Sequence, residues 1–229
     1  MSRAVSILCF GDSLTAGYHS YGIEYHPYAD ELERVLREEF PGIEFYPTVA
    51  GLPGDLVCWP GSFQSRMKSK CDHARYDWLI CLGGTNDLGY GKLAEEMYDG
   101  LQKTWHIALD TGCRVIALTV PECKARSSSL DNRRFDLNKM ILAHKAERFY
   151  TLDFQSKIPY HSSDENFIEK HFDDGLHLTP EGYDFMGRLI AERMIGLLKD
   201  QGLVGKTREV DPVLDSSEYV DVEMIYYAP

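Results

Sequence analysis

The feature that most constrains the fold is an alternation of short apolar runs with longer segments of helical pattern. The apolar runs cover residues 4–10, 43–47, 78–84, 114–120 and 149–154, and each ends at glycine, proline or a polar cluster. Nearly continuous apolar runs are typical of parallel strands that helices cover on both faces. The chain is therefore expected to form a three-layer α/β/α fold around a parallel sheet of about five strands.

Segments of helical pattern separate these runs. They cover residues 25–40, 93–110 and 132–147, and a last one extends from Glu181 to about Leu198. The last helix has the clearest start, because Thr179 can cap it and Pro180 fits its first position. Ligands of such folds bind beyond the carboxyl ends of the strands, so the loops after the strands are where chemistry is expected.

The composition divides the chain near residue 205. Residues 1–205 are long enough for one α/β domain, whereas residues 206–229 form an acidic tail. Between residues 209 and 229 there are six acidic residues and no lysine or arginine. Residues 218–227 alternate apolar and polar side chains, which predicts an extended arm that packs on its own domain or across a homodimer.

The net charge and the cysteines limit the classes of protein to which the chain can belong. A formal net charge of −12 would repel phosphate backbones and anionic lipid surfaces, so no nucleic-acid or membrane partner is expected. The first apolar run begins too early to leave room for a signal segment, which favours a cytoplasmic protein. The six cysteines form no Cys-x-x-Cys pair, and we interpret them as reduced and structural.

Residues that offer polar side chains or an accessible backbone N–H group follow four of the predicted strands. Ser13 follows the first, Gly54 the second and Asn86 the third, and Asp174 and His177 follow the fifth at a spacing of three residues. That spacing on a tight bend lets a carboxylate hold one imidazole nitrogen while the other faces a nucleophile. Each feature alone has an ordinary structural explanation as a helix cap, an Asx turn or a type II turn.

Other classes of site remain open at this point. His171, Asp173, Asp174 and His177 could form a metal site, although no His-x-x-x-His or cysteine set accompanies them. A flavodoxin-like nucleotide-binding protein is disfavoured, because no glycine-rich phosphate loop with a lysine follows the first strand. The Gly-x-Ser-x-Gly motif of ordinary α/β-hydrolases is also missing from the sequence.

Taken in order, these residues resemble the four sequence blocks of the GDSL, or SGNH, hydrolase family. The blocks are FGDSLTAGY at residues 10–18, GLPGD at 51–55, GGTND at 83–87 and DGLH at 174–177. The segments TVPE and RRFDLN also look like the family's usual segments at those places. The resemblance spans roughly residues 5–199, and it is specific because four separated motifs agree.

The resemblance implies a flavodoxin-like fold and hydrolysis of esters through an acyl-serine. Ser13 would be the nucleophile, His177 the general base and Asp174 the carboxylate that orients the imidazole. The backbone N–H groups of Ser13 and Gly54 and the side-chain amide of Asn86 would form the oxyanion hole. No metal and no organic cofactor are expected.

The expected substrate is a small carboxylic ester with a short acyl chain. Alternatives within the family are a carbohydrate O-acetyl esterase, a thioesterase or an acyltransferase, and a noncatalytic binding domain is the alternative from another class. Activity should survive a chelator and fall at acidic pH, because a general base must be neutral to accept a proton. Several aromatic side chains could line the substrate cleft or belong to the core: Tyr18, Tyr21, Tyr25, Trp59 and Phe63.

Overall fold

The computed structural model describes residues 3–59 and 61–205. Its main sheet has five strands in the order β4-β1-β5-β6-β7, and every neighbouring pair is parallel. This confirms the predicted fold class. The strands are β1 (Arg3–Gly11), β4 (Ile43–Gly51), β5 (Trp78–Cys81), β6 (Arg114–Leu118) and β7 (Phe149–Leu152).

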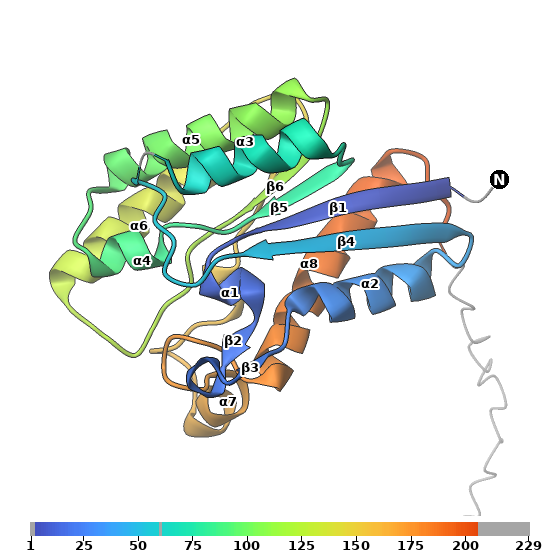
Figure 1. The fold of residues 1–229 in the computed structure, drawn as a ribbon. Coiled ribbons are helices and arrows are strands. Elements are labelled where there is room, and N and C mark those ends of the chain that lie inside the picture. Colours follow the sequence, from blue (N-terminus) through green and yellow to red (C-terminus); the bar gives the residue numbers. More distant parts are fainter. Residues whose placement is uncertain (1–2, 60, 206–229) are drawn as a thin grey trace, which may run out of the picture.

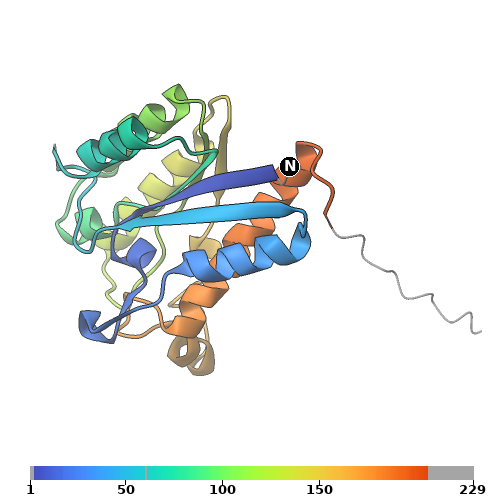
Figure 2. The ribbon, with the colours of Figure 1, turned by 45° about the vertical axis from the view of Figure 1, so that its right-hand side comes forward.

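Helices cover both faces of this sheet (Figure 1). The helices α2 and α8 pack together and share one hydrophobic core with the sheet, and α3, α5 and α6 contribute to the second core on its other face. Figure 2 shows the same three layers after rotation. The long helices are α2 (Tyr28–Glu39), α3 (Phe63–His73), α5 (Ala94–Asp110), α6 (Ser128–Ala143) and α8 (Pro180–Asp200).

Shorter elements lie around the loops that follow the strands. Strands β2 (Tyr18–His19) and β3 (Glu24–Tyr25) form a small antiparallel hairpin around the 3-10 turn η1 (Ser20–Gly22). The short helices are α1 (Ser13–Ala16), α4 (Thr85–Gly89) and α7 (Glu165–His171), and a 3-10 turn η2 covers Gln155–Lys157. Helix α1 follows β1 directly and α4 follows β5 closely, so both lie at the carboxyl edge of the sheet.

Strand β1 shows why the apolar runs are almost unbroken. Ile7 and Cys9 belong to the core shared with α2 and α8, whereas Leu8 and Phe10 belong to the core on the opposite face. Successive side chains of a strand point to opposite faces, and here both faces are covered, so nearly every position is buried.

Several boundaries differ from the sequence-based prediction. Strand β4 continues to Gly51, because it is an edge strand and its Pro47 therefore breaks no ladder between two neighbours. Helix α6 begins at Ser128, four positions before the predicted start, because the Ser127 hydroxyl accepts the N–H of Leu130 as an N-cap. Helices α3 and α7 were not predicted.

The structure also bears on the predicted helix cap, the cysteines, membrane spans and the tail. Thr179 caps α8 as predicted, since its hydroxyl accepts the N–H of Gly182 at 3.0 Å. All six cysteines are free thiols. Among residues 3–59 and 61–205, no helix is both long and apolar enough to span a bilayer. The predicted tail and its extended arm at 218–227 lie outside the described residues.

Candidate active site

Ser13 is the first residue of α1, directly after β1 and the Gly-Asp turn. Asp12 caps this short helix by accepting the N–H of Leu14 at 3.0 Å, and the helix ends at Gly17, whose φ of 77° lies in the left-handed region. Both features keep α1 to one turn. The Ser13 side chain is therefore held just beyond the carboxyl end of β1.

A chain of hydrogen bonds joins Ser13 to the loop before α8. The Oγ of Ser13 lies 3.0 Å from Nε2 of His177, and Nδ1 of His177 lies 2.8 Å from Oδ2 of Asp174. Ser13 and His177 are 164 positions apart in the sequence, and the fold brings them together because β1 and the loop before α8 meet at the same edge of the sheet. The arrangement can move a proton from the hydroxyl to the imidazole.

Asp174 is held in its ionised form by several donors. Its Oδ1 accepts the backbone N–H groups of Leu176 at 2.9 Å and His177 at 2.8 Å, while Oδ2 faces the His177 ring. Partial burial by itself would raise the pKa of Asp174, but these hydrogen bonds outweigh it and lower the pKa below its ordinary value. The carboxylate thus stays charged and orients the imidazole.

The position of His177 is also fixed by contacts to other loops. The ring of Tyr18 packs on the imidazole with a centroid distance of 4.4 Å. The carboxylate of Asp173 accepts the N–H of Ser20 at 2.8 Å, and the Asp173 N–H donates to the carbonyl of His177 at 2.9 Å. The β2–β3 hairpin is therefore tied to the loop that carries the histidine.

Two of the residues predicted as oxyanion donors are Gly54, in the loop after β4, and Asn86, on α4. Gly54 has a φ of 79°, a conformation that residues with a Cβ rarely adopt, and a Cβ added there would meet no atom within 4 Å. The Asn86 amide nitrogen donates one hydrogen bond to the carbonyl of Asp55 at 3.0 Å. An amide group has two N–H donors, so this bond orients Asn86 and leaves its second donor for a ligand.

Asp87 is a residue that the sequence analysis missed. It is fully buried, and its carboxylate accepts the N–H groups of Val57 and Cys58, each at 2.9 Å. These bonds tie α4, which carries Asn86, to the loop that carries Gly54. The GGTND block contains Asp87 directly beside Asn86, and this proximity was the signal that could have identified it.

Arg66 and Asp55 form a second support that the sequence analysis missed. The Asp55 carboxylate contacts the Arg66 guanidinium at 2.6 Å, and Arg66 also donates to the carbonyls of Gly11 at 2.8 Å and Ala50 at 3.0 Å. The arginine therefore connects the ends of β1 and β4 to the residue after Gly54. The sequence analysis could not place Arg66 near the site, because it did not predict the helix α3 that carries this residue.

Asp12 has a different electrostatic environment from Asp174. It is buried, and its Oδ2 has no hydrogen-bond partner among the described residues. Burial raises the pKa of Asp12 to about 6, although the N–H of Leu14 acts in the opposite direction. Asp12 is therefore a carboxyl group that titrates well above its ordinary range.

The alternative metal site is not supported by the positions of its side chains. The ring of His171 packs against Phe167 and Phe185, and its Nδ1 bonds the carbonyl of Phe167. Within residues 3–59 and 61–205, no three His, Cys, Asp or Glu side chains cluster in a way that could hold a metal ion.

The aromatic residues of the predicted cleft loops separate into two groups. Phe63 is fully buried in the core beneath α3. Tyr21, Tyr25 and Trp59 are exposed, so they do not belong to the core. Tyr18 is partly buried against His177. Core and cleft interpretations were both open, and the structure assigns only Phe63 to the core.

Comparison with known proteins supplies relatives of the same fold. A crystal structure of a lipase/acylhydrolase from Enterococcus faecalis superposes with a TM-score of 0.66 at 21% identity, covering 84% of this chain and 96% of that chain. A carbohydrate esterase family 3 protein from Talaromyces cellulolyticus gives 0.64 at 14% identity, covering 86% and 99%.

A third solved structure is a mutant of Axe2, an acetyl-xylooligosaccharide esterase from Geobacillus Stearmophilus. It gives a TM-score of 0.63 at 16% identity and covers 85% of this chain and 96% of that chain. No curated protein sequence matches the chain significantly.

The model of one protein family matches most of the chain. The match covers residues 9–185, which include Ser13, Gly54, Asn86, Asp174 and His177. The chain therefore belongs to the GDSL-like lipase/acylhydrolase family.

Proposed function

We propose that this protein is a serine hydrolase that cleaves small carboxylic esters through an acyl-serine intermediate. The observation that carries the proposal is the unbroken chain of hydrogen bonds from Ser13 Oγ through the His177 ring to Asp174, with distances of 3.0 and 2.8 Å. The proposed hydrolase unit comprises residues 1–205.

In the first half of the reaction, Ser13 Oγ attacks the ester carbonyl carbon while His177 Nε2 accepts the hydroxyl proton. The carbonyl oxygen becomes an oxyanion, and the N–H of Ser13, the N–H of Gly54 and the Asn86 amide stabilise it. Collapse of this intermediate breaks the bond to the alcohol oxygen, which takes the proton from Nε2. The products are the free alcohol and the acyl-serine.

In the second half, a water molecule attacks the acyl carbon and His177 accepts its proton. The bond to Ser13 Oγ then breaks, the proton returns to the serine, and the carboxylic acid leaves. Asp174 remains ionised throughout, because its hydrogen bonds lower its pKa, and it stabilises the imidazolium that forms at each step.

A series of p-nitrophenyl esters of increasing acyl length tests this function. Wild-type protein should release p-nitrophenol fastest from the short-chain esters, and Ser13→Ala should release it at a rate close to buffer. A fluorophosphonate probe should label the wild type at Ser13 and leave Ser13→Ala unlabelled. Turnover by Ser13→Ala that equals the wild type would refute the proposal.

The same assay separates the alternative substrates. Two structural relatives are described as a carbohydrate esterase and an acetyl-xylooligosaccharide esterase, so acetylated xylo-oligosaccharides belong in the panel. A thioester analogue of the best ester and an alcohol acceptor test for thioesterase and acyltransferase activity. Failure to react with any ester and with the fluorophosphonate would favour a noncatalytic binding domain.

A further inference from the structure

A mostly apolar cavity of about 530 Å³ adjoins the candidate active site. It lies between α4, the loop after β6 and the start of α6, and we call it the α6 cavity. Its walls include Thr85, which precedes Asn86, and the segment Asp174–Leu176, which precedes His177. A substrate held at Ser13 can therefore extend into the α6 cavity.

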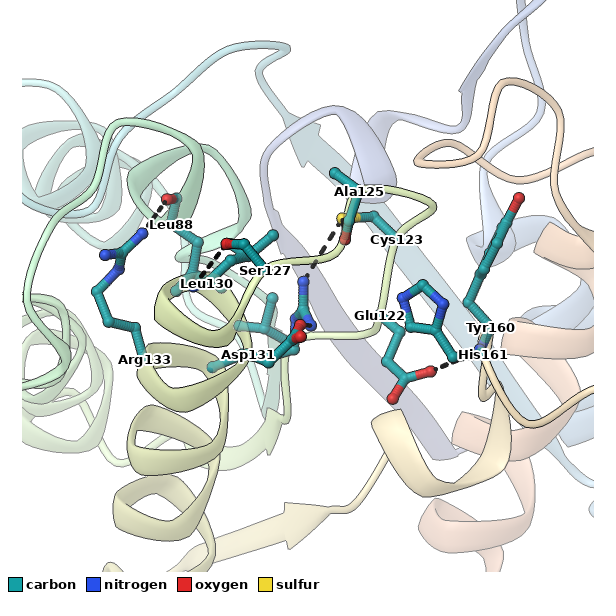
Figure 3. A network of polar contacts seen from close by, with 12 residues as sticks. Leu88, Glu122, Cys123, Ala125, Ser127, Leu130, Asp131, Arg133, Tyr160 and His161 are labelled. Atoms are coloured by element: carbon teal, nitrogen blue, oxygen red, sulfur yellow. Dashed lines mark hydrogen bonds and ion pairs between the residues drawn. The ribbon is translucent and has the colours of Figure 1, made fainter.

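Arg134 is a buried cation in the wall of this cavity. Only 4% of its side chain is exposed. Its Nη1 lies 3.1 Å from one oxygen of Asp131, its Nη2 lies 3.5 Å from the sulfur of Cys123, and its Nε has no hydrogen-bond partner among the described residues. Its two partners come from different segments, Asp131 from α6 and Cys123 from the preceding loop, and Figure 3 shows both side chains.

These contacts leave one edge of the guanidinium underused. A guanidinium has five N–H donors, and Nε and Nη2 together form an edge that matches the two oxygens of a carboxylate. On Arg134 this edge contacts only the thiol of Cys123, which is a weak acceptor. A buried cation with so few acceptors is costly, and a ligand oxygen pair would relieve that cost.

The other charges of the α6 cavity favour an anionic ligand. Lys124 also lines it, and the one acidic side chain in its described lining, Asp174, is already bonded to His177 and to two backbone N–H groups. Asp131 neutralises Arg134 through only one of its oxygens and is itself 35% exposed. The charged groups without a committed partner in this wall are therefore cationic, and the neutral hydroxyl of Thr85 is a further wall group that has no partner among the described residues.

We propose that the α6 cavity binds a carboxylate of the substrate through the Nε and Nη2 edge of Arg134. This proposal rests on the proposed esterase function and names its substrate class as esters that carry a second, free carboxylate. The carboxylate displaces the Cys123 thiol from the guanidinium and accepts two parallel hydrogen bonds. It belongs either to a dicarboxylic half-ester, on the acyl side, or to an esterified hydroxy acid, on the alcohol side.

The test compares kcat/KM for matched charged and neutral esters. On the acyl side, the p-nitrophenyl half-esters of succinic, glutaric and adipic acid are compared with the butyrate, valerate and hexanoate, after subtraction of the uncatalysed rate. On the alcohol side, 4-acetoxybenzoate is compared with its methyl ester. The charged partner should be preferred in the series whose carboxylate reaches Arg134.

Variants then show whether Arg134 carries this preference. Arg134→Met should lower the charged-to-neutral ratio by about tenfold to hundredfold, the range expected for a hydrogen bond between charged groups. Arg134→Lys should keep part of the preference, because it retains the charge without the planar edge. Arg133→Met is the matched control, since the adjacent Arg133 bonds Ser129 and the carbonyl of Leu88 and does not line the cavity.

If Arg134→Met fails to fold, as judged by its thermal melt, Arg134→Lys and Asp131→Asn decide the question. Asp131→Asn removes the competing carboxylate and should raise the ratio. An equal ratio in the wild type, Arg134→Lys and Asp131→Asn would overturn the proposal and leave Arg134 a support of the loop. If the protein hydrolyses neutral esters in a Ser13-dependent way but shows no preference for charged ones, only this inference is refuted. If it hydrolyses no ester at all, the proposed function is refuted.

Discussion

One arginine on α3 supports the segments that carry the candidate oxyanion donors, and another lies in the wall of the α6 cavity, yet the two arginines differ in their hydrogen bonding. Arg66 donates to the Asp55 carboxylate and to the carbonyls of Gly11 and Ala50. Arg134 is more deeply buried and has one carboxylate oxygen and one thiol as acceptors.

This difference matches what each region is proposed to do. Groups that stabilise a developing charge work best when they are already in place, because no reorganisation is then needed during the reaction. Asp87, Asp55 and Arg66 satisfy that requirement through bonds made within the protein. A subsite that recognises a substrate must instead keep donors available for it. Variants in the first region should therefore slow every ester, whereas variants in the second should change the order of preference.

The largest effect is expected at the proton-transfer chain itself. Ser13→Ala and His177→Ala should each lower kcat by roughly 10⁴-fold or more, and the double variant should lose little beyond either single one, because both residues act in one covalent step. Steady-state kinetics with p-nitrophenyl acetate and far-UV circular dichroism check the rate and the fold. Additive losses in the double variant would contradict a shared step.

The next effect is expected at Asn86, within the preorganised region. Asn86→Ala removes one proposed oxyanion donor and should lower kcat by about 10²- to 10³-fold with little change in KM. The loss should be the same for charged and neutral esters, which sharpens the contrast with Arg134. A loss confined to one substrate class would place Asn86 in substrate recognition instead.

Asp87→Asn should have a smaller effect on rate and a clear effect on stability. The substituted amide can accept only one of the two N–H groups that Asp87 now accepts, and it leaves the other without its charged partner. We expect a loss of about 2 kcal/mol in the free energy of unfolding and a slower reaction with every ester. Urea denaturation measures the first and p-nitrophenyl acetate kinetics the second.

The control for Asp87→Asn is Asp72→Asn on α3. Asp72 forms an exposed ion pair with Lys68, so its loss should change stability by less than about 1 kcal/mol. If both variants were equally stable, the loop between β4 and α3 would be held by something other than Asp87.

The last prediction concerns Asp12, where the expected change is one of stability and depends on pH. Burial raises its pKa from 3.8 to about 6 in the folded protein, so the folded state binds this proton more tightly than the unfolded state does. Ionisation of Asp12 therefore lowers stability as pH rises from about 4 through 6, by up to about 3 kcal/mol. Asp12→Asn keeps an acceptor for the Leu14 N–H and should be more stable than wild type above pH 6.

The advantage of Asp12→Asn should shrink as pH falls through 6 towards 4 and should be lost below about pH 3.8, where the wild-type carboxyl group is protonated in both states. Thermal melts of the two proteins across this range measure the difference. A constant difference at all pH values would show that the buried carboxyl group does not carry the raised pKa.

The sequence predicted the sheet well and some of the helices poorly. Strands such as β1 are buried on both faces, so their apolar runs are readable without any knowledge of their neighbours. Helix α3 escaped prediction because few of its residues face the core, with Phe63 and Met67 as its buried members. The end of β4 was missed because Pro47 is an acceptable residue only where the strand lies at an edge, and that position is a property of the sheet.

The sequence by itself determined which polar groups follow which strands, and hence that Ser13, Gly54, Asn86 and the Asp174–His177 pair would meet at one edge of a parallel sheet. Only the tertiary structure decided the 3.0 Å contact between Ser13 and His177, the support of the donors by Asp87 and Arg66, and the underused edge of Arg134. The physical reason is that the succession of strands along the chain follows from local patterns, and their parallel direction from the helices that connect them. Hydrogen-bond partners and burial depend instead on residues that are distant in sequence and are placed only by packing.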